Sequence, residues 1–185
     1  MGIILKSESQ IETMRRSGKA AAELLQQIGE GVAPGVSTAQ LDQISRRTIK
    51  KLKGRSSFLG YQPSNHPPYP ATICSSINDE VVHGVPGKRR TLKDGDVIGI
   101  DVAIKIDDYH GDNAYTFPVG DISPQAQRLL EVTKASLFKG IEQARSGNRI
   151  GDVAYAVQTC VEAEGFSVVR ELCGHGIGRD MWEEP

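Results

Sequence analysis

The sequence has little of what marks a secreted or membrane-embedded protein. Its three cysteines form no Cys-x-x-Cys motif and one would be left over, so a reduced, cytoplasmic protein is expected rather than a disulfide framework. No stretch approaches the roughly 20 apolar residues of a membrane helix. The apolar start from Ile3 to Leu5 is too short for a secretory signal.

An excess of charge of one sign is also lacking. The 22 lysines and arginines are balanced by 23 aspartates and glutamates, which gives no indication of binding to nucleic acid or to an anionic membrane. Hydrophobic residues make up 38% and charged residues 24%, which excludes a disordered or collagen-like chain. The length of 185 residues predicts one globular domain over 1–185.

Four segments carry apolar residues at helical spacing. Helices are predicted at about 7–28, 37–54, 123–147 and 150–164. Ser7 with Gln10, or Ser9 with Glu12, would cap the first helix. Pro124 suits the first position of the third, where its missing N–H costs nothing.

Between the second and third helices the pattern changes to short β-branched runs. Strands are predicted at 72–77, 97–104 and 109–119, with 105–108 as a hairpin loop, and a further strand is predicted at 168–172. The region from Gly54 to Val82 is rich in Ser, Pro and Asn, which predicts a long loop entering the first of these strands.

A glycine, a polar turn and a helix start follow one another around Gly35, and the same pattern recurs around Gly147, 112 residues later. At that offset Ile49 corresponds to Val161, so the inward faces of the two helices agree. Either the chain is a duplicated, two-half fold, or helix–Gly–helix chemistry alone produces the similarity. If the duplication is real, the counterpart of the 97–119 hairpin would lie beyond Pro185.

Asp101 and Asp112 are the most informative residues. The midpoint between them falls inside the predicted loop, so a symmetric hairpin would place them directly opposite each other, where like charges are destabilising. They would then share a proton or bracket a cation. The alternative is a register that differs by one or two residues, with both acids facing water.

The four histidines differ in their surroundings. His175 is flanked by two glycines, which leave its imidazole open to a cation or substrate, whereas a histidine beside one glycine, such as His83, is more often a turn residue. His110 is expected on the opposite face of its strand from Asp112, outside the site. His66 is expected to be solvated.

Several long motifs resemble type I methionine aminopeptidases. They are the stretches at 76–86, 95–102, 109–112 and 161–179. The resemblance covers essentially the whole chain. It implies the pita-bread fold, an α/β (α+β) architecture in which pseudo-symmetric halves place helices behind a curved antiparallel sheet. It also implies a cytoplasmic enzyme that removes N-terminal methionine from nascent proteins using two divalent ions (Co, Mn, Fe, Zn or Ni).

The resemblance also implies roles for individual residues. Asp101, Asp112 and His175 would be metal ligands, and His83 would contact the substrate near the scissile amide. The side chains expected to line the methionine pocket are Phe58, Tyr61, Tyr69, Cys74 and Met181. Trp182 stands where the family has a histidine that helps to stabilise the tetrahedral intermediate.

The resemblance implies an incomplete second half, because the family takes two further glutamate ligands from strands downstream of Pro185. Reduced or lost turnover is therefore expected. Nascent methionyl peptides and the ribosome are the expected partners, without direct nucleic-acid or membrane binding, and a monomer is expected. One alternative is a catalytically inactive pita-bread module that binds peptides or ribosomes. Another is a proline dipeptidase, which these motifs fit less well.

Overall fold

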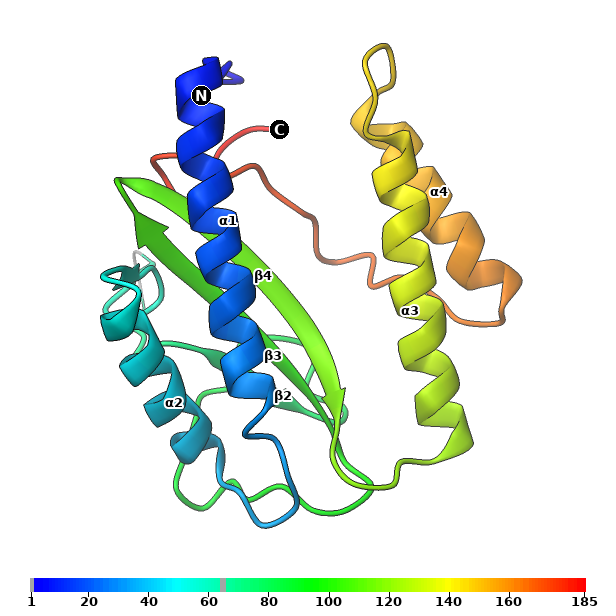
Figure 1. Ribbon diagram of the computed structural model, residues 1–185. Coiled ribbons are helices and arrows are strands. Elements are labelled where there is room, and N and C mark those ends of the chain that lie inside the picture. The colour runs from blue at the N-terminus through cyan, green and yellow to red at the C-terminus, as the bar shows by residue number, and fades with distance from the viewer. Residues whose placement is uncertain (1, 64–65) are drawn as a thin grey trace. The chain divides into compact units, whose positions relative to one another are not determined.

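The computed structural model describes residues 2–63 and 66–185, and these form two compact units (Figure 1). The first unit contains the chain up to Ile122 together with His175–Glu184, and the second contains Ser123–Gly174 with Pro185. His175 therefore folds with the same unit as Asp101 and Asp112, although the second unit intervenes in the sequence. Within the described residues, no helix is long and apolar enough to cross a membrane.

The first unit is built on a four-stranded antiparallel sheet with β3 (Val97–Ile106) at its centre. β4 (Tyr109–Pro118) pairs along one edge of β3, and β2 (Cys74–Ile77) and β1 (Arg55–Ser56) pair along the other. The three strands predicted before the third helix are confirmed. β1 was not predicted, because two residues carry no periodicity. Residues 64 and 65 of the predicted long loop lie outside the described chain.

The turn between β3 and β4 is shorter than predicted. Only Asp107 and Asp108 lie outside the strands, and both have positive φ angles, 48° and 66°. A two-residue loop with positive φ at both positions is the favoured hairpin connection, because its twist matches that of the strands. The four-residue loop at 105–108 is therefore corrected to two residues, which changes the register of the whole hairpin.

Two helices cover one face of this sheet. α1 (Glu8–Gly29) and α2 (Thr38–Lys51) each begin with a reciprocal capping box, Ser7 with Gln10 and Ser37 with Gln40, so the first of the two proposed caps is correct. Alternate residues of β3 point toward the helices and are fully buried in the apolar core. These residues are Ile98, Ile100, Val102 and Ile104.

Gly111 in β4 lets α1 approach the sheet closely. A Cβ atom at this position would lie 2.2 Å from the carbonyl oxygen of Ser17 and 2.8 Å from the backbone nitrogen of Gly18. A side chain is thus excluded by helix backbone, which cannot move aside as a flexible side chain could. The glycine serves the packing of α1 on the sheet.

The second unit consists of α3 (Pro124–Gln143) and α4 (Ile150–Ala163), packed on each other through Gly140 and Val157. α2 begins at Thr38 and ends at Lys51, and adding 112 to these residue numbers gives Ile150 and Ala163, where α4 begins and ends. The two helices therefore match at the offset found in the sequence. The large apolar side chains that this unit leaves exposed are Leu129, Leu137, Phe138, Ile141, Ile150, Tyr155, Val169 and Leu172.

The strand predicted at 168–172 is not present. The backbone there forms no ladder, and Val169 and Leu172 are about half exposed, at 51% and 49%. A strand needs a hydrogen-bonding partner, and among the described residues the second unit contains no strand that could supply one.

Candidate metal centre

The carboxyl groups of Asp101 and Asp112 meet on the sheet face that is turned away from α1 and α2. Asp101 lies opposite Ala114, and Asp112 lies opposite Ala103, so the prediction that the two acids oppose each other directly is wrong by two residues. A two-residue shift does not change the face on which a side chain lies. The acids are therefore diagonal neighbours, joined by a hydrogen bond, and both are half-buried rather than facing water.

Each of these two acids has a raised pKa. Burial, the charge of Asp112 and the hydrogen bond to it raise the pKa of Asp101 to about 7. Burial also raises the pKa of Asp112, against the opposing charge of His175. Two ionised carboxylates at this separation repel, so the pair needs a shared proton or a cation. Carboxylate oxygens are suitable ligands for hard divalent ions.

His175 presents one ring nitrogen to this pair. Its Nδ1 lies 2.9 Å from the carbonyl oxygen of Gly176. A carbonyl can only accept, so Nδ1 carries a proton and donates it, and in the neutral imidazole the lone pair then belongs to Nε2. Nε2 lies 3.8 Å from Oδ2 of Asp112. This is the tautomer that a metal-ligating histidine requires when it binds through Nε2.

The three side chains form a row rather than a closed cage. Asp101 contacts Asp112, and Asp112 is near His175. In the described part of the chain, no three His, Cys, Asp or Glu side chains are arranged to hold a metal ion. Two carboxylates and a neutral imidazole are a suitable donor set for a divalent transition metal, but they form only part of a site.

His110 lies on the same face as Asp112, so its expected exclusion from this face is wrong. Residues two apart in a regular strand share a face, and this spacing alone would have identified it. The Nδ1 of His110 lies 2.7 Å from the Ser57 hydroxyl, and its backbone N–H donates to Gly178, 2.8 Å away. Burial lowers its pKa, which favours the neutral imidazole.

Most of the expected methionine-pocket residues gather beside Asp101. Cys74 lies directly opposite it across β2 and β3, and burial raises the pKa of the Cys74 thiol to about 11, so the thiol is neutral. The rings of Phe58 and Tyr69 meet edge-on at 6.3 Å. Tyr61 is exposed, but its carbonyl accepts a hydrogen bond from the backbone of Tyr69, 2.8 Å away.

Asp42 in α2 anchors the chain just before Cys74, a role that no sequence pattern indicated. Its Oδ1 accepts hydrogen bonds from both the backbone N–H and the hydroxyl of Thr72, each at 2.7 Å. Its Oδ2 accepts from Arg46, also at 2.7 Å. The side chain of Asp42 is 11% exposed, so this network anchors the start of β2 to α2 from within the core.

His83 lies on an exposed loop with a φ of 60°, an uncommon conformation for a residue other than glycine. The next residue ties the loop to β2, because the N–H of Ser75 donates to the Gly84 carbonyl at 2.7 Å. Glu80 and Arg90 brace the same loop with an ion pair. Within the described chain, no hydrogen bond joins His83 to the acid pair or to His175.

The last two expected pocket residues follow His175 in the 175–184 segment. Met181 is buried, and Trp182 is about half exposed, at 51%. The indole and imidazole rings of Trp182 and His175 lie 4.0 Å apart between centroids, tilted by 31°. Trp182 is thus placed against the broad face of the imidazole.

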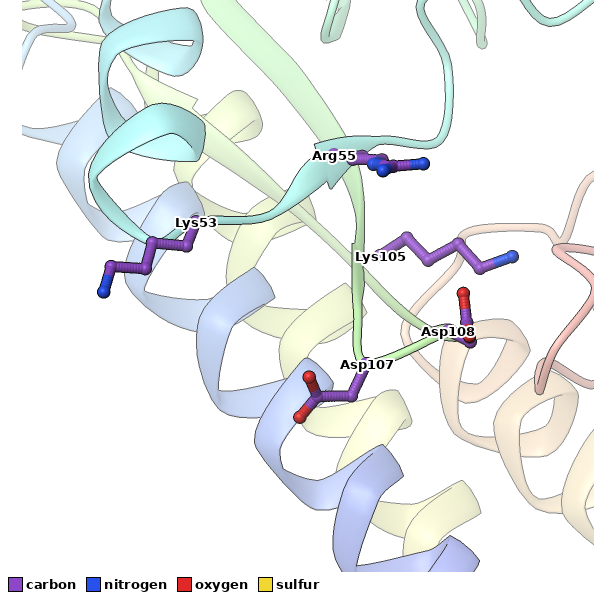
Figure 2. A pocket seen from close by; sticks show the side chains of 5 residues that line it. All are labelled: Lys53, Arg55, Lys105, Asp107 and Asp108. Carbon is purple, nitrogen blue, oxygen red and sulfur yellow. The ribbon is translucent and has the colours of Figure 1, made fainter.

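The acid pair lies outside the hollow found at the β3–β4 turn (Figure 2). That cavity, of about 240 Å³, is lined by Lys53, Arg55, Lys105, Asp107 and Asp108. Its charges are mixed, and it includes none of the predicted site residues. Asp107 is already paired with Arg16 at 2.8 Å. The candidate metal centre is therefore identified from its aspartate and histidine side chains, and it does not coincide with this cavity.

Comparison with known proteins identifies the family of this chain. The model of metallopeptidase family M24 matches residues 12–185. The chain belongs to that family. It is 46% identical over 183 residues to methionine aminopeptidase 1 of Bacillus subtilis, covering 99% of this chain and 71% of the relative. It is 44% identical to methionine aminopeptidase of Escherichia coli, covering all of this chain and 69% of the relative.

Solved structures of M24 members have the same fold. The methionine aminopeptidase of Rickettsia prowazekii matches all of this chain, and 72% of its own length, with a TM-score of 0.94 and 38% identity. The fold is thus the pita-bread fold of the methionine aminopeptidases, as expected. Prolidase from Pyrococcus furiosus matches with a TM-score of 0.82 at 17% identity, a likeness of fold alone.

Proposed function

We propose that this protein is a methionine aminopeptidase that hydrolyses the first peptide bond of chains beginning with methionine. The observation that carries the proposal is the contact of Asp101 with Asp112, with Nε2 of His175 3.8 Å from Oδ2 of Asp112, in a chain whose relatives are methionine aminopeptidases. These three residues would hold divalent metal. Such ions, when bound, lower the pKa of water and polarise the scissile carbonyl.

The other residues would bind and orient the substrate. The cluster of Phe58, Tyr69 and Cys74 offers a half-buried, neutral surface beside Asp101, suited to an unbranched thioether. Tyr61 and Met181 would complete its rim. His83, held by the Gly84 contact with β2, would approach the scissile amide from the exposed loop. Its uncommon backbone conformation is typical of residues that act at a site.

The remaining partners follow from this activity. Nascent chains in the cytoplasm would be the substrates, with the ribosome as a further partner and a monomer as the acting form. We treat residues 1–185 as one aminopeptidase domain, because the family match runs through both compact units. The chain spans about 70% of the length of these relatives.

A second candidate is a pita-bread module that binds methionyl peptides without cleaving them. One observation favours it: Trp182 replaces the family's histidine. An indole donates one hydrogen bond but neither accepts one nor titrates. Metal binding separates the two candidates, because a peptide-binding module does not need it.

The test is calorimetric titration of the purified protein with Mn²⁺ or Co²⁺, followed by chromatographic analysis of Met-Ala-Ser after incubation with the metal. We expect binding by the parent and its loss in Asp101→Ala and Asp112→Ala. Asp107→Asn is the matched control, because it changes an exposed acid of the same hairpin. Equal binding by the parent and Asp101→Ala would refute the proposed centre. Binding without release of methionine would favour the second candidate.

A further inference from the structure

A part-buried ion pair joins the two ends of the first unit. The ammonium group of Lys6, just before α1, contacts the carboxylate of Glu183 in the 175–184 segment. The two side chains are 15% and 5% exposed. Figure 1 shows this red segment passing the N-terminal end of α1. The other ion pairs that α1 makes, such as Arg15 with Glu12, lie on the exposed surface, so this one has a different environment.

Glu183 fills the inside of the turn that follows His175. The backbones of Glu183 and Gly176 exchange two hydrogen bonds, at 2.8 and 2.9 Å. The Glu183 carboxylate accepts the N–H of Asp180 and occupies the space in which a Cβ of Gly178 would lie. Hydrogen bonding to Lys6 lowers the pKa of Glu183, so the carboxylate is charged.

This turn controls the orientation of the imidazole. The carbonyl that accepts the Nδ1–H of His175 belongs to Gly176, the residue held by Glu183. The contacts therefore run from Lys6 to Glu183, from Glu183 to Gly176, and from Gly176 to the ring of His175. If the turn opens, the carbonyl moves, and Nδ1 loses the acceptor that keeps the proton off Nε2.

We propose that Lys6 and Glu183 are positioning residues that hold His175 in the tautomer and orientation needed to ligate metal. The proposal rests on the proposed function for its purpose, but the ring orientation itself is defined by contacts within the chain. Partners that orient a metal-ligating histidine typically change affinity 10- to 100-fold when they are lost. Lys6 acts through one further residue, so we expect an effect near the lower limit.

The first measurement needs no metal. Long-range ¹H–¹⁵N NMR of the ¹⁵N-labelled, metal-free protein identifies the tautomer of each neutral histidine, and His175→Gln assigns the signal. We expect one Nδ1–H tautomer for His175 in the parent and in Lys6→Arg, which retains the charge. Lys6→Ala and Glu183→Gln should give a mixture of both tautomers. Lys51→Ala, which removes an exposed ion pair with Glu23, should match the parent.

The second measurement is the Kd for Mn²⁺, followed through the fluorescence of Trp182, the single tryptophan of the chain, stacked on His175. We expect Kd to rise about tenfold in Lys6→Ala and Glu183→Gln and to stay within about twofold in Lys6→Arg and Lys51→Ala. Glu183→Gln keeps the volume of the side chain, so the comparison survives if Lys6→Ala fails to fold.

The two measurements separate the two proposals. A single Nδ1–H tautomer in folded Glu183→Gln, with the parent Kd, would overturn the positioning role. Absence of Mn²⁺ binding by the parent would instead overturn the proposed function, and the NMR comparison would still decide whether Lys6 and Glu183 orient the ring.

Discussion

Asp101 and Asp112 are diagonal neighbours across β3 and β4, offset from direct opposition by two residues and joined by a hydrogen bond. The offset arises at the Asp107-Asp108 turn, yet it leaves both carboxyl groups on the face turned away from α1. Direct opposition would bring the Cβ atoms to about 5 Å, whereas a diagonal pair lies about 7–8 Å apart. The wider spacing leaves room for a proton or an ion between the carboxyl oxygens.

The raised pKa of Asp101 predicts that the metal-free protein loses stability as the pH rises. Between pH about 4 and about 7 the folded state holds a proton that the unfolded chain has released, so the free energy of unfolding falls over this window. We expect a loss of at least about 1.4 kcal/mol, equivalent to a tenfold change in proton affinity. Urea unfolding with chelator at about pH 5 and about pH 7.5 measures it.

Asp101→Asn is the control for this pH dependence. Its amide can still donate to Asp112 but does not ionise, so the fall in stability over this pH window should become smaller. An unchanged slope in the variant would mean that other groups cause the dependence.

Replacing Trp182 by histidine should increase turnover of Met-Ala-Ser. Histidine restores a group that donates a hydrogen bond to a developing oxyanion, and loss of one such donor typically costs about 10²–10³ in rate. We expect at least about a tenfold gain in kcat with metal present, measured by release of free methionine. Trp182→Phe keeps an aromatic ring against His175 without a donor and should show no gain. A gain in kcat in both variants would indicate that the smaller ring at position 182, and not a restored hydrogen-bond donor, increases turnover.

Gly111→Ala should destabilise the protein by about 3 kcal/mol, because the added Cβ would overlap the backbone of α1 at Ser17. Urea unfolding measures the effect. Gly18→Ala, one residue further along α1, has nothing within 4 Å of the added atom and should stabilise the helix by about 0.5–1 kcal/mol. Equal effects of the two changes would contradict the close approach of α1 to β4.

Asp42→Ala should cost about 2–4 kcal/mol of stability, since it leaves the buried N–H and hydroxyl of Thr72 without their acceptor. Thermal unfolding measures the loss. Asp42→Asn retains one acceptor oxygen and should cost less. If both variants unfold at the parent temperature, the network does not anchor the start of β2.

The sequence predicted most of the fold because the fold depends on local chemistry. The four helices were predicted from capping serines, Pro124 and apolar periodicity. The repeated pattern around Gly35 and Gly147 predicted that α2 and α4 match at an offset of 112 residues. The strand expected at 168–172 failed for a non-local reason. Strand formation requires a neighbour, which no property of the segment itself can provide.

The sequence indicated which residues lie together but not their geometry. The structure brings Asp101, Asp112 and His175 near one another, and charge in an apolar strand and a histidine between glycines are visible in the sequence. The register depended on whether the turn had two residues or four, which the sequence left open. Asp42 and the Lys6–Glu183 pair join segments far apart in the chain, and no spacing rule reveals such contacts.

The alternation along β3 gives its two faces different tolerances to substitution. Positions 98, 100, 102 and 104 are fully buried, whereas 101 carries the carboxylate on the other side. A saturation scan from Ile98 to Val102, scored separately for cellular abundance and for methionine release, should therefore oscillate with a period of two. Polar replacements at the even-numbered positions would destabilise the fold and lower the abundance of the protein. Asp101 variants would reach normal abundance and lose only methionine release.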